Sequence, residues 1–294
     1  MLSGIPIPKD AVRPPETVLV NITPQETRVA VLEENNICEL HIERNSGHSL
    51  VGNIYLGVVR RVLPGMQSAF IDIGLERAAF LHIVDVLEQR RNPDETQRIE
   101  HMLFEGQSVL VQVIKDPINT KGARLSTQIS LAGRFLVHLP QEDHIGISQR
   151  IEDDAERNSL RERLTNLLPE DACHGYIIRT NAENATDEQL LSDIHYLTKV
   201  WEHIQEQAKT QPPETLLYQD LPLSLRVLRD MFSLDTQKIL VDSTENHRRM
   251  TRFAEQYVHG ALGRIELFKG ERPLFETHNV EQEISRPCSD KSNR

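Results

Sequence analysis

The fold of this chain is decided by residues 52–83, GNIYLGVVRRVLPGMQSAFIDIGLERAAFLHI. This stretch contains three runs of β-branched and aromatic residues, which predict three short strands. Pro64-Gly65 and the run from Gly74 to Arg77 supply the turns between them. A further run, SVLVQVIKD, adds a strand after a long acidic loop, LEQRRNPDETQRIEHML. Roughly five strands in about 75 residues favour a small closed Greek-key barrel of the OB type.

Two aromatic residues stand out in these predicted strands. Phe70 and Phe80 lie on strands that one turn joins, and each follows an alanine. If both rings are exposed on the barrel, they form a platform on which nucleobases stack. The alternative is that both rings belong to the hydrophobic core. Lys115 and Lys121 follow the last predicted strand, where backbone phosphates would run.

Strands and helices flank the predicted barrel on both sides. Before it, residues 17–22, 27–33 and 37–44 read as strands. After Gly133 helices alternate with strands, which indicates an α/β layer. Local signals mark one helix well, because Thr186 and Gln189 form a capping box at its start and Pro212-Pro213 ends it. The remaining predictions are helices at RNSLRERLTNLL, LPLSLRVLRDMF and 243–258, and strands at GYIIRT, KILVDS and RIELFKG.

Composition limits the classes of protein that remain. The formal net charge of −11 argues against a nucleic-acid binder, but the segment from Lys115 to Arg134 carries four basic residues against one acid. No apolar run reaches the roughly 20 residues of a membrane span, and the first residues do not resemble a secretory signal. Cys38, Cys173 and Cys288 are too scattered for a disulfide framework or a zinc site, so we expect a cytoplasmic protein.

The motifs together resemble the ribonuclease E/G family, and its ribonuclease G branch in particular. The similarity runs over residues 16–286 and includes residues 52–82, KDPINTKGARLSTQISLAG, GISQRIE, GYIIRT, DLPLSLRVLRDMF, KILVDS and LFETHNVEQEIS. The resemblance implies an α+β fold in which an RNase H-like α/β layer carries an inserted OB barrel and an α/β 5′-sensor unit. The expected ranges are 16–48 and 225–286 for the RNase H-like layer, 49–127 for the barrel, 128–224 for the 5′-sensor and 287–294 for a disordered tail.

The resemblance also implies roles for particular residues. Phe70 and Phe80 match the family's base-stacking pair, and Lys115 and Lys121 match its RNA-contacting lysines. The expected 5′-monophosphate site consists of four residues, Gly133, Val137, Arg179 and Thr180. An Arg fork with a Thr hydroxyl suits a phosphate, and a Gly lets a terminal nucleotide approach closely. The chain departs from the family at Leu56, where a Lys is usual, and so lacks a positive charge there.

The family cleaves RNA with two aspartates that hold Mg²⁺, and a pair of cysteines shares Zn²⁺ between protomers. Both are expected beyond Arg286, where the ending PCSDKSNR departs from the family's pattern. We therefore expect no catalytic residue, no metal ligand and no cofactor of its own in this chain. Its other acids are not expected to replace them: Asp153 and Asp154 cap a helix, Asp72 fixes a turn, and Asp242 lies on a strand.

Three functions remain open from the sequence. The first is a single-stranded RNA binder that senses 5′-monophosphate ends in RNA processing and decay, with no DNA or membrane partner. The second is an endoribonuclease that is active only when the missing catalytic half is supplied in trans. The third is a non-catalytic regulatory partner of a full-length homologue.

Overall fold

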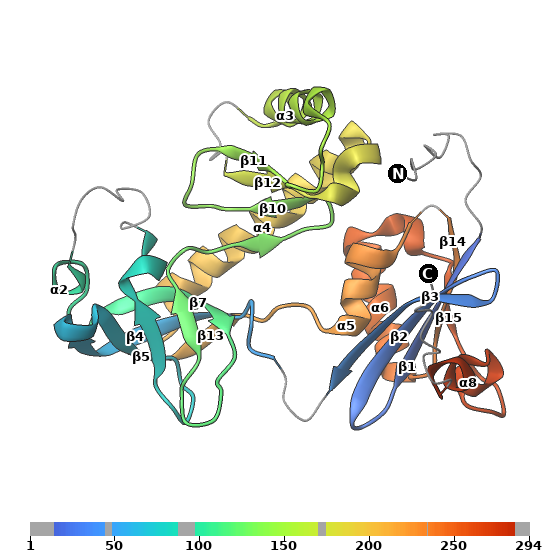
Figure 1. The fold of residues 1–294 in the computed structure, drawn as a ribbon, viewed down its shortest axis with the longest axis horizontal. Coiled ribbons are helices and arrows are strands. Elements are labelled where there is room, and N and C mark those ends of the chain that lie inside the picture. Colours follow the sequence, from blue (N-terminus) through green and yellow to red (C-terminus); the bar gives the residue numbers. More distant parts are fainter. Residues whose placement is uncertain (1–14, 45–48, 88–97, 170–174, 234, 286–294) are drawn as a thin grey trace, which may run out of the picture. The chain divides into compact units, whose positions relative to one another are not determined.

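The computed structural model describes residues 15–44, 49–87, 98–169, 175–233 and 235–285 (Figure 1). The chain divides into two compact units, one made of residues 1–48 and 221–294 and the other of residues 49–220. Two sequence expectations lie wholly or mostly outside the described residues: the acidic loop, at 88–97, and the tail at 287–294. No helix in the described ranges is both long and apolar enough to cross a membrane.

The first unit is built on one five-stranded sheet in the order β15-β14-β1-β2-β3. Its strands are β1 (Glu16–Ile22), β2 (Glu26–Glu33), β3 (Asn36–Arg44), β14 (Thr236–Val241) and β15 (Ile265–Leu267). β1 to β3 form an antiparallel meander, whereas β14 and β15 run parallel to β1. This order is the RNase H-like topology, which confirms the expected fold class.

Both faces of this sheet are covered, which explains the continuous apolar run in β1. Val18 and Val20 pack with α5 (Leu223–Arg226), the π-helical turn η5 (Val227–Met231) and α6 (Thr244–Tyr257). Leu19 packs on the opposite face with α7 (Leu274–Thr277) and α8 (Val280–Ser285). A strand that is buried on both faces loses the apolar–polar alternation of a half-exposed strand.

The second unit contains the predicted barrel. Its sheet has the order β13-β4-β5-β6-β8-β7, and an additional pairing of β4 with β7 closes five of these strands on themselves. The barrel strands are β4 (Ile54–Leu63), β5 (Ser68–Asp72), β6 (Ala79–His82), β7 (Ser108–Lys115) and β8 (Arg124–Ser126). Short helical turns lie between them: η2 (Pro64–Met66), η3 (Ile83–Asp85) and α2 (Ile99–Met102).

The rest of the second unit is a small α/β part with its own core. Its sheet has the order β11-β12-β10-β9, and two helices pack with it. The elements are β9 (Leu131–Ala132), β10 (Leu136–His138), β11 (Ile145–Ile147), α3 (Asp154–Leu167), β12 (Tyr176–Ile178), η4 (Thr180–Asn184) and α4 (Asp187–Thr210). β13 (Thr215–Tyr218) follows α4 and pairs with β4 of the barrel. Two-sided burial of β4 links the parts, since Tyr55 belongs to the barrel core and Ile54 to the α/β core.

Local helix signals are confirmed. Thr186 caps α4, and the reciprocal bonds between Thr186 and Gln189 form the predicted capping box. Asp153 caps α3 by accepting from the backbone amides of Ala155 and Glu156. Such a cap satisfies amides that have no partner within the helix.

Candidate functional site

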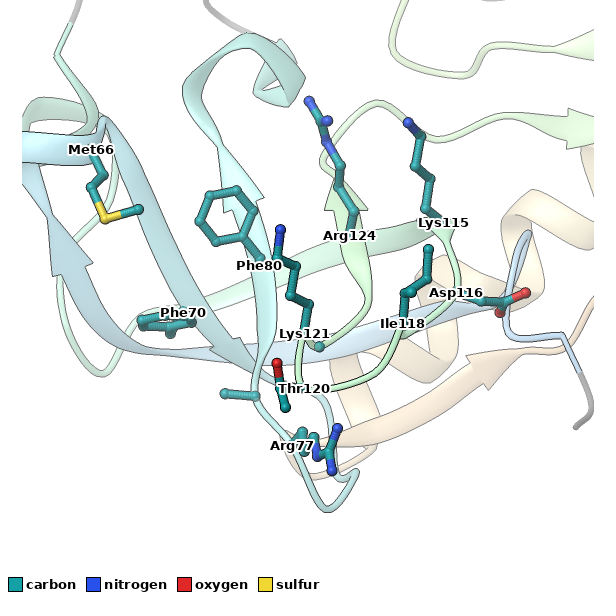
Figure 2. A pocket seen from close by; sticks show the side chains of 12 residues that line it. Met66, Phe70, Arg77, Phe80, Lys115, Asp116, Ile118, Thr120, Lys121 and Arg124 are labelled. Carbon is teal, nitrogen blue, oxygen red and sulfur yellow. The ribbon is translucent and has the colours of Figure 1, made fainter.

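A cavity of about 840 Å³ opens on the barrel where β5 and β6 face the loop between β7 and β8. All four residues predicted to contact RNA line this cavity: Phe70, Phe80, Lys115 and Lys121 (Figure 2). The barrel therefore brings together two aromatic rings and two ammonium groups that are separated by up to 51 positions in the sequence.

The aromatic pair lies outside the barrel core. Phe70 and Phe80 stand directly opposite each other on antiparallel strands, and Phe70 is 37% exposed. The preceding residues, Ala69 and Ala79, are fully buried. Because side chains alternate along a strand, the small alanines fill the tapering interior and the phenylalanines point to the other side. The core interpretation of the two rings is wrong for this reason.

The two lysines belong to the exposed edge of the cavity. Lys115 is the last residue of β7, and Lys121 pairs with Ile118 across the tight loop that follows. The neighbouring acid, Asp116, accepts hydrogen bonds from the Ser49 hydroxyl at 2.8 Å and the Leu50 amide at 2.6 Å. Those bonds hold its carboxylate on the loop before β4, and the lysines supply the positive charge at the edge.

Two arginines without a predicted site role also line the cavity. Arg124 opens β8 and is paired in register with Phe80. Its Nε and Nη2 both lie 2.8 Å from Oδ2 of Asp85, a side chain that is only 5% exposed. Arg77 donates to the carbonyl of Asn119 at the loop tip. β8 has only three residues, too few for a periodic pattern that would predict whether the Arg124 side chain points inward or outward.

Leu56, the departure from the family's lysine, does not line the cavity. It pairs with Thr215 of β13 and Leu110 of β7, and its side chain packs against the α/β core. An apolar residue suits that position, because a lysine would have to carry its ammonium group past the packed side chains to reach water.

The residues predicted to form a 5′-phosphate site lie in the α/β part of the same unit. Arg179 follows β12, and its Nη1 donates to the carbonyl oxygen of Gly133, the first residue after β9. Val137 of β10 is half-buried and faces Ile177 across the strand pair. Thr180 is half-buried and opens η4 directly after Arg179. The fold thus joins Arg179 to Gly133 by a hydrogen bond. Thr180 is the residue after Arg179, and Val137 lies on β10, which pairs with β12.

The Asp193 side chain occupies the space next to Gly133. A Cβ atom at this position would lie 2.5 to 2.7 Å from the carboxylate atoms of Asp193 on α4. The sequence explained this glycine by the approach of a nucleotide, whereas the structure gives a different steric reason. Burial raises the pKa of Asp193, and this effect is opposed by hydrogen bonds from three backbone amides and by the charge of Arg179.

Asp72 and Asp242 serve the local structure. Asp72 accepts from the Gly74 amide at 3.0 Å and binds Arg60, which fixes the turn after β5 as predicted. Asp242 accepts from the Asn21 side chain and the Ile22 amide. In the described ranges no three His, Cys, Asp or Glu side chains are close enough to hold a metal ion. Asp72 and Asp242 therefore do not fit a Mg²⁺ or Zn²⁺ site.

Comparison with known proteins agrees with this geometry. A model of the ribonuclease E/G family matches residues 130–293, more than half of the chain. The chain belongs to the ribonuclease E/G family. The match covers the α/β part of the second unit, which holds Gly133 and Arg179, and continues past α8 to residue 293.

Individual ribonucleases extend the similarity to the barrel. Ribonuclease G of Salmonella typhimurium is 42% identical over 281 residues, which cover 93% of this chain and 57% of that protein. Ribonuclease G of Escherichia coli K12 is 41% identical with the same coverage. Ribonuclease E of a Nostoc species is 36% identical over 267 residues, or 90% of this chain and 38% of that protein. The chain thus spans a little more than half the length of these ribonuclease G relatives.

Proposed function

We propose that this chain binds single-stranded RNA in the barrel cavity and recognises the 5′-monophosphate end of that RNA near Arg179. The observation that carries the proposal is the cavity itself, which combines the exposed ring of Phe70 and the half-buried ring of Phe80 with the lysines at its edge. Membership of the ribonuclease E/G family supports RNA as the ligand.

The physics of the cavity suits a flexible single strand. Every base has an aromatic face, so stacking on Phe70 or Phe80 tolerates any sequence and contributes about 1–3 kcal/mol per base. Lys115 and Lys121 have no ion-pair partner in the part of the chain that the structure describes. Their charges can therefore act on the phosphates, and binding should weaken as salt rises. The lysine side chains at this edge give it a local positive charge, and this local charge attracts RNA phosphates although the net charge of the chain is −11.

In this proposal the α/β part, and not the barrel, recognises the 5′ end of the RNA. A guanidinium can hold a phosphate through two parallel hydrogen bonds, and the Thr180 hydroxyl beside Arg179 adds a donor. A terminal monophosphate offers more charge and more acceptor oxygens than a 5′-hydroxyl. We therefore assign Gly133, Val137, Arg179 and Thr180 to the 5′-phosphate site, and we regard residues 49–127 and 128–224 as the two functional parts.

The test compares two RNAs of one sequence, one with a 5′-monophosphate and one with a 5′-hydroxyl, by fluorescence anisotropy of a 3′ label. We expect the monophosphate RNA to bind more tightly, and Arg179→Ala to bring its Kd to that of the hydroxyl RNA. Arg150→Ala is the matched control, since Arg150 is an exposed arginine of the same α/β part. Equal Kd values for both RNAs with the unaltered chain would refute end recognition, and no binding of either would refute the whole proposal.

We further infer a role in cytoplasmic RNA processing and decay, in line with the ribonucleases that the chain resembles. Endonucleolytic cleavage is a second candidate, because those relatives extend well beyond the matched region. The remaining portion of a ribonuclease G relative, added as a separate polypeptide with Mg²⁺, tests it. Cleavage only in the mixture would favour activity in trans, whereas unchanged RNA would leave binding, including binding as a regulatory partner, as the function.

A further inference from the structure

We infer that Asp193 is a positioning residue of the proposed 5′-end site, because its carboxylate holds the turn at residues 133–136 against which Arg179 is set. The inference rests on the proposed function. It adds a residue that lies more than 50 positions from Gly133 in the sequence and that carries no recognisable motif.

The carboxylate binds three consecutive backbone amides. Oδ1 of Asp193 accepts from the amide of Arg134 at 2.9 Å, and Oδ2 accepts from the amides of Phe135 and Leu136 at 2.8 Å each. Asp193 is 7% exposed and projects from α4. Successive amides that point into one concavity form an anion site. Here the anion is supplied by the protein itself, so an external phosphate does not occupy this concavity.

The other side of the same turn faces Arg179. The guanidinium Nη1 donates to the carbonyl of Gly133 and lies 3.4 Å from the carbonyl of Arg134. The backbone amide of Arg179 donates to the carbonyl of Phe135 at 2.8 Å. Amides of the turn therefore bind Asp193, and carbonyls of the turn bind Arg179. The two charged side chains fix one stretch of backbone from opposite sides.

Sterics make this arrangement specific to glycine at position 133. A side chain there would collide with the carboxylate, since its Cβ would lie 2.5 Å from Oδ2 of Asp193. The opposite charge of Arg179 also favours the ionised carboxylate. Asp193 thus determines where the guanidinium stands and how it is oriented before RNA arrives, and a preorganised donor binds a phosphate without the cost of ordering a mobile side chain.

Asp193→Asn tests the inference, because it keeps the size of the side chain and replaces one acceptor oxygen by a donor. We expect the ratio of Kd values for 5′-hydroxyl and 5′-monophosphate RNA to fall about ten-fold, the size of losing one charge-assisted hydrogen bond. The Kd for 5′-hydroxyl RNA should stay at its original value, because the barrel cavity is unchanged. Glu188→Gln, an exposed acid on the same helix, is the matched control and should keep the full ratio.

A second variant perturbs the contact between Asp193 and the same turn by a change in the turn itself. Gly133→Ala leaves both charges in place but pushes the carboxylate away from the amides, so it should also lower the ratio. Preservation of the original ratio in Asp193→Asn would overturn the inference. So would a parallel loss of affinity for both RNAs in both variants, since that would make Asp193 a residue of general stability. If the unaltered chain shows no preference for the monophosphate, the proposed function fails, and this outcome is distinct from either.

Discussion

Phe70 and Phe80 meet edge to face across adjacent strands, with their ring centroids 6.2 Å apart and their planes at 64°. This geometry follows from a register in which the two residues are directly opposite and from alanines that occupy the inward positions before them. An edge-to-face pair is favoured over a face-to-face sandwich. It also turns the two ring faces in different directions, so under the proposed function each ring would receive a base of its own.

Removal of either ring should weaken RNA binding whatever the 5′ end. We expect Phe70→Ala and Phe80→Ala each to cost about 1–3 kcal/mol of binding free energy, because each removes one stacking surface. The Kd of a short 5′-hydroxyl RNA measures this effect. Phe104→Ala is the control, since Phe104 is 67% exposed and lies outside the cavity. An equal loss in Phe104→Ala, or no loss in the other two variants, would contradict the stacking role.

The salt dependence of binding should report the lysines directly. A contact with one phosphate of a single strand contributes about 0.7 to the slope of log K against log salt concentration. Lys115→Ala and Lys121→Ala should each lower that slope by about this amount, and the double variant by about twice as much. Titrations between low and moderate KCl measure it. Lys209→Ala, an exposed lysine near the end of α4, should leave the slope unchanged.

The Asp85–Arg124 pair should contribute to stability more than a surface ion pair does. Asp85 is 5% exposed, and its removal leaves the Arg124 guanidinium without its two 2.8 Å bonds. Because the Arg124 side chain is 37% exposed and stays partly hydrated, we expect Asp85→Ala to lower the free energy of unfolding by about 1.5–3 kcal/mol, as for hydrogen bonds to a charged group. Urea unfolding followed by Trp201, the single tryptophan and a residue of the same unit, measures this change.

An exposed ion pair in the same unit provides the comparison. Asp187 is 59% exposed and binds Arg163, so Asp187→Ala should cost no more than about 1 kcal/mol. A cost for Asp85→Ala as small as that for Asp187→Ala would mean that the barrel does not depend on the buried pair.

Much of the fold could be predicted because its signals are local. The β-branched runs of β1, β2 and β4 and the capping box at Thr186 need only neighbours in sequence, and each was placed within a few residues. Two short strands, unlike β12 and β15, have no such local signal. β8 and β13 have three and four residues, and they exist because distant strands offer them free edges.

The candidate site likewise contains residues that could be predicted from the sequence and residues that could not. Phe70 and Phe80 were found because aromatic residues at equivalent positions of a hairpin form a visible pattern. The bonds of Asp193 to residues 134–136 join segments 57 to 59 positions apart and follow from the packing of α4, so no periodicity reveals them. The neighbour that a Cβ at Gly133 would meet, the Asp193 carboxylate, is likewise visible only in three dimensions.

Histidine 138 should make the α/β part sensitive to acid. His138 is buried, stacks on Tyr176 with ring centroids 4.6 Å apart, and has its Nδ1 3.1 Å from the carbonyl oxygen of Gly175. Burial lowers the pKa of His138 below its usual value near 6.5, although the Gly175 carbonyl opposes the shift. The unfolded chain therefore binds this proton more readily than the folded chain does. The stability that depends on the neutral ring is present above about pH 6.5 and is lost as the pH falls.

Urea unfolding at pH 7.5, 6.0 and 5.0, followed by Trp201, measures this loss. His138→Asn places an amide donor where Nδ1 stood and cannot gain a proton, so its unfolding midpoint should fall less between pH 7.5 and 5.0 than that of the unaltered chain. His195→Asn, at an exposed position of α4, should keep the original pH dependence. If His138→Asn lost stability toward acid as steeply as the unaltered chain, the buried imidazole would not be the group that limits the α/β part at low pH.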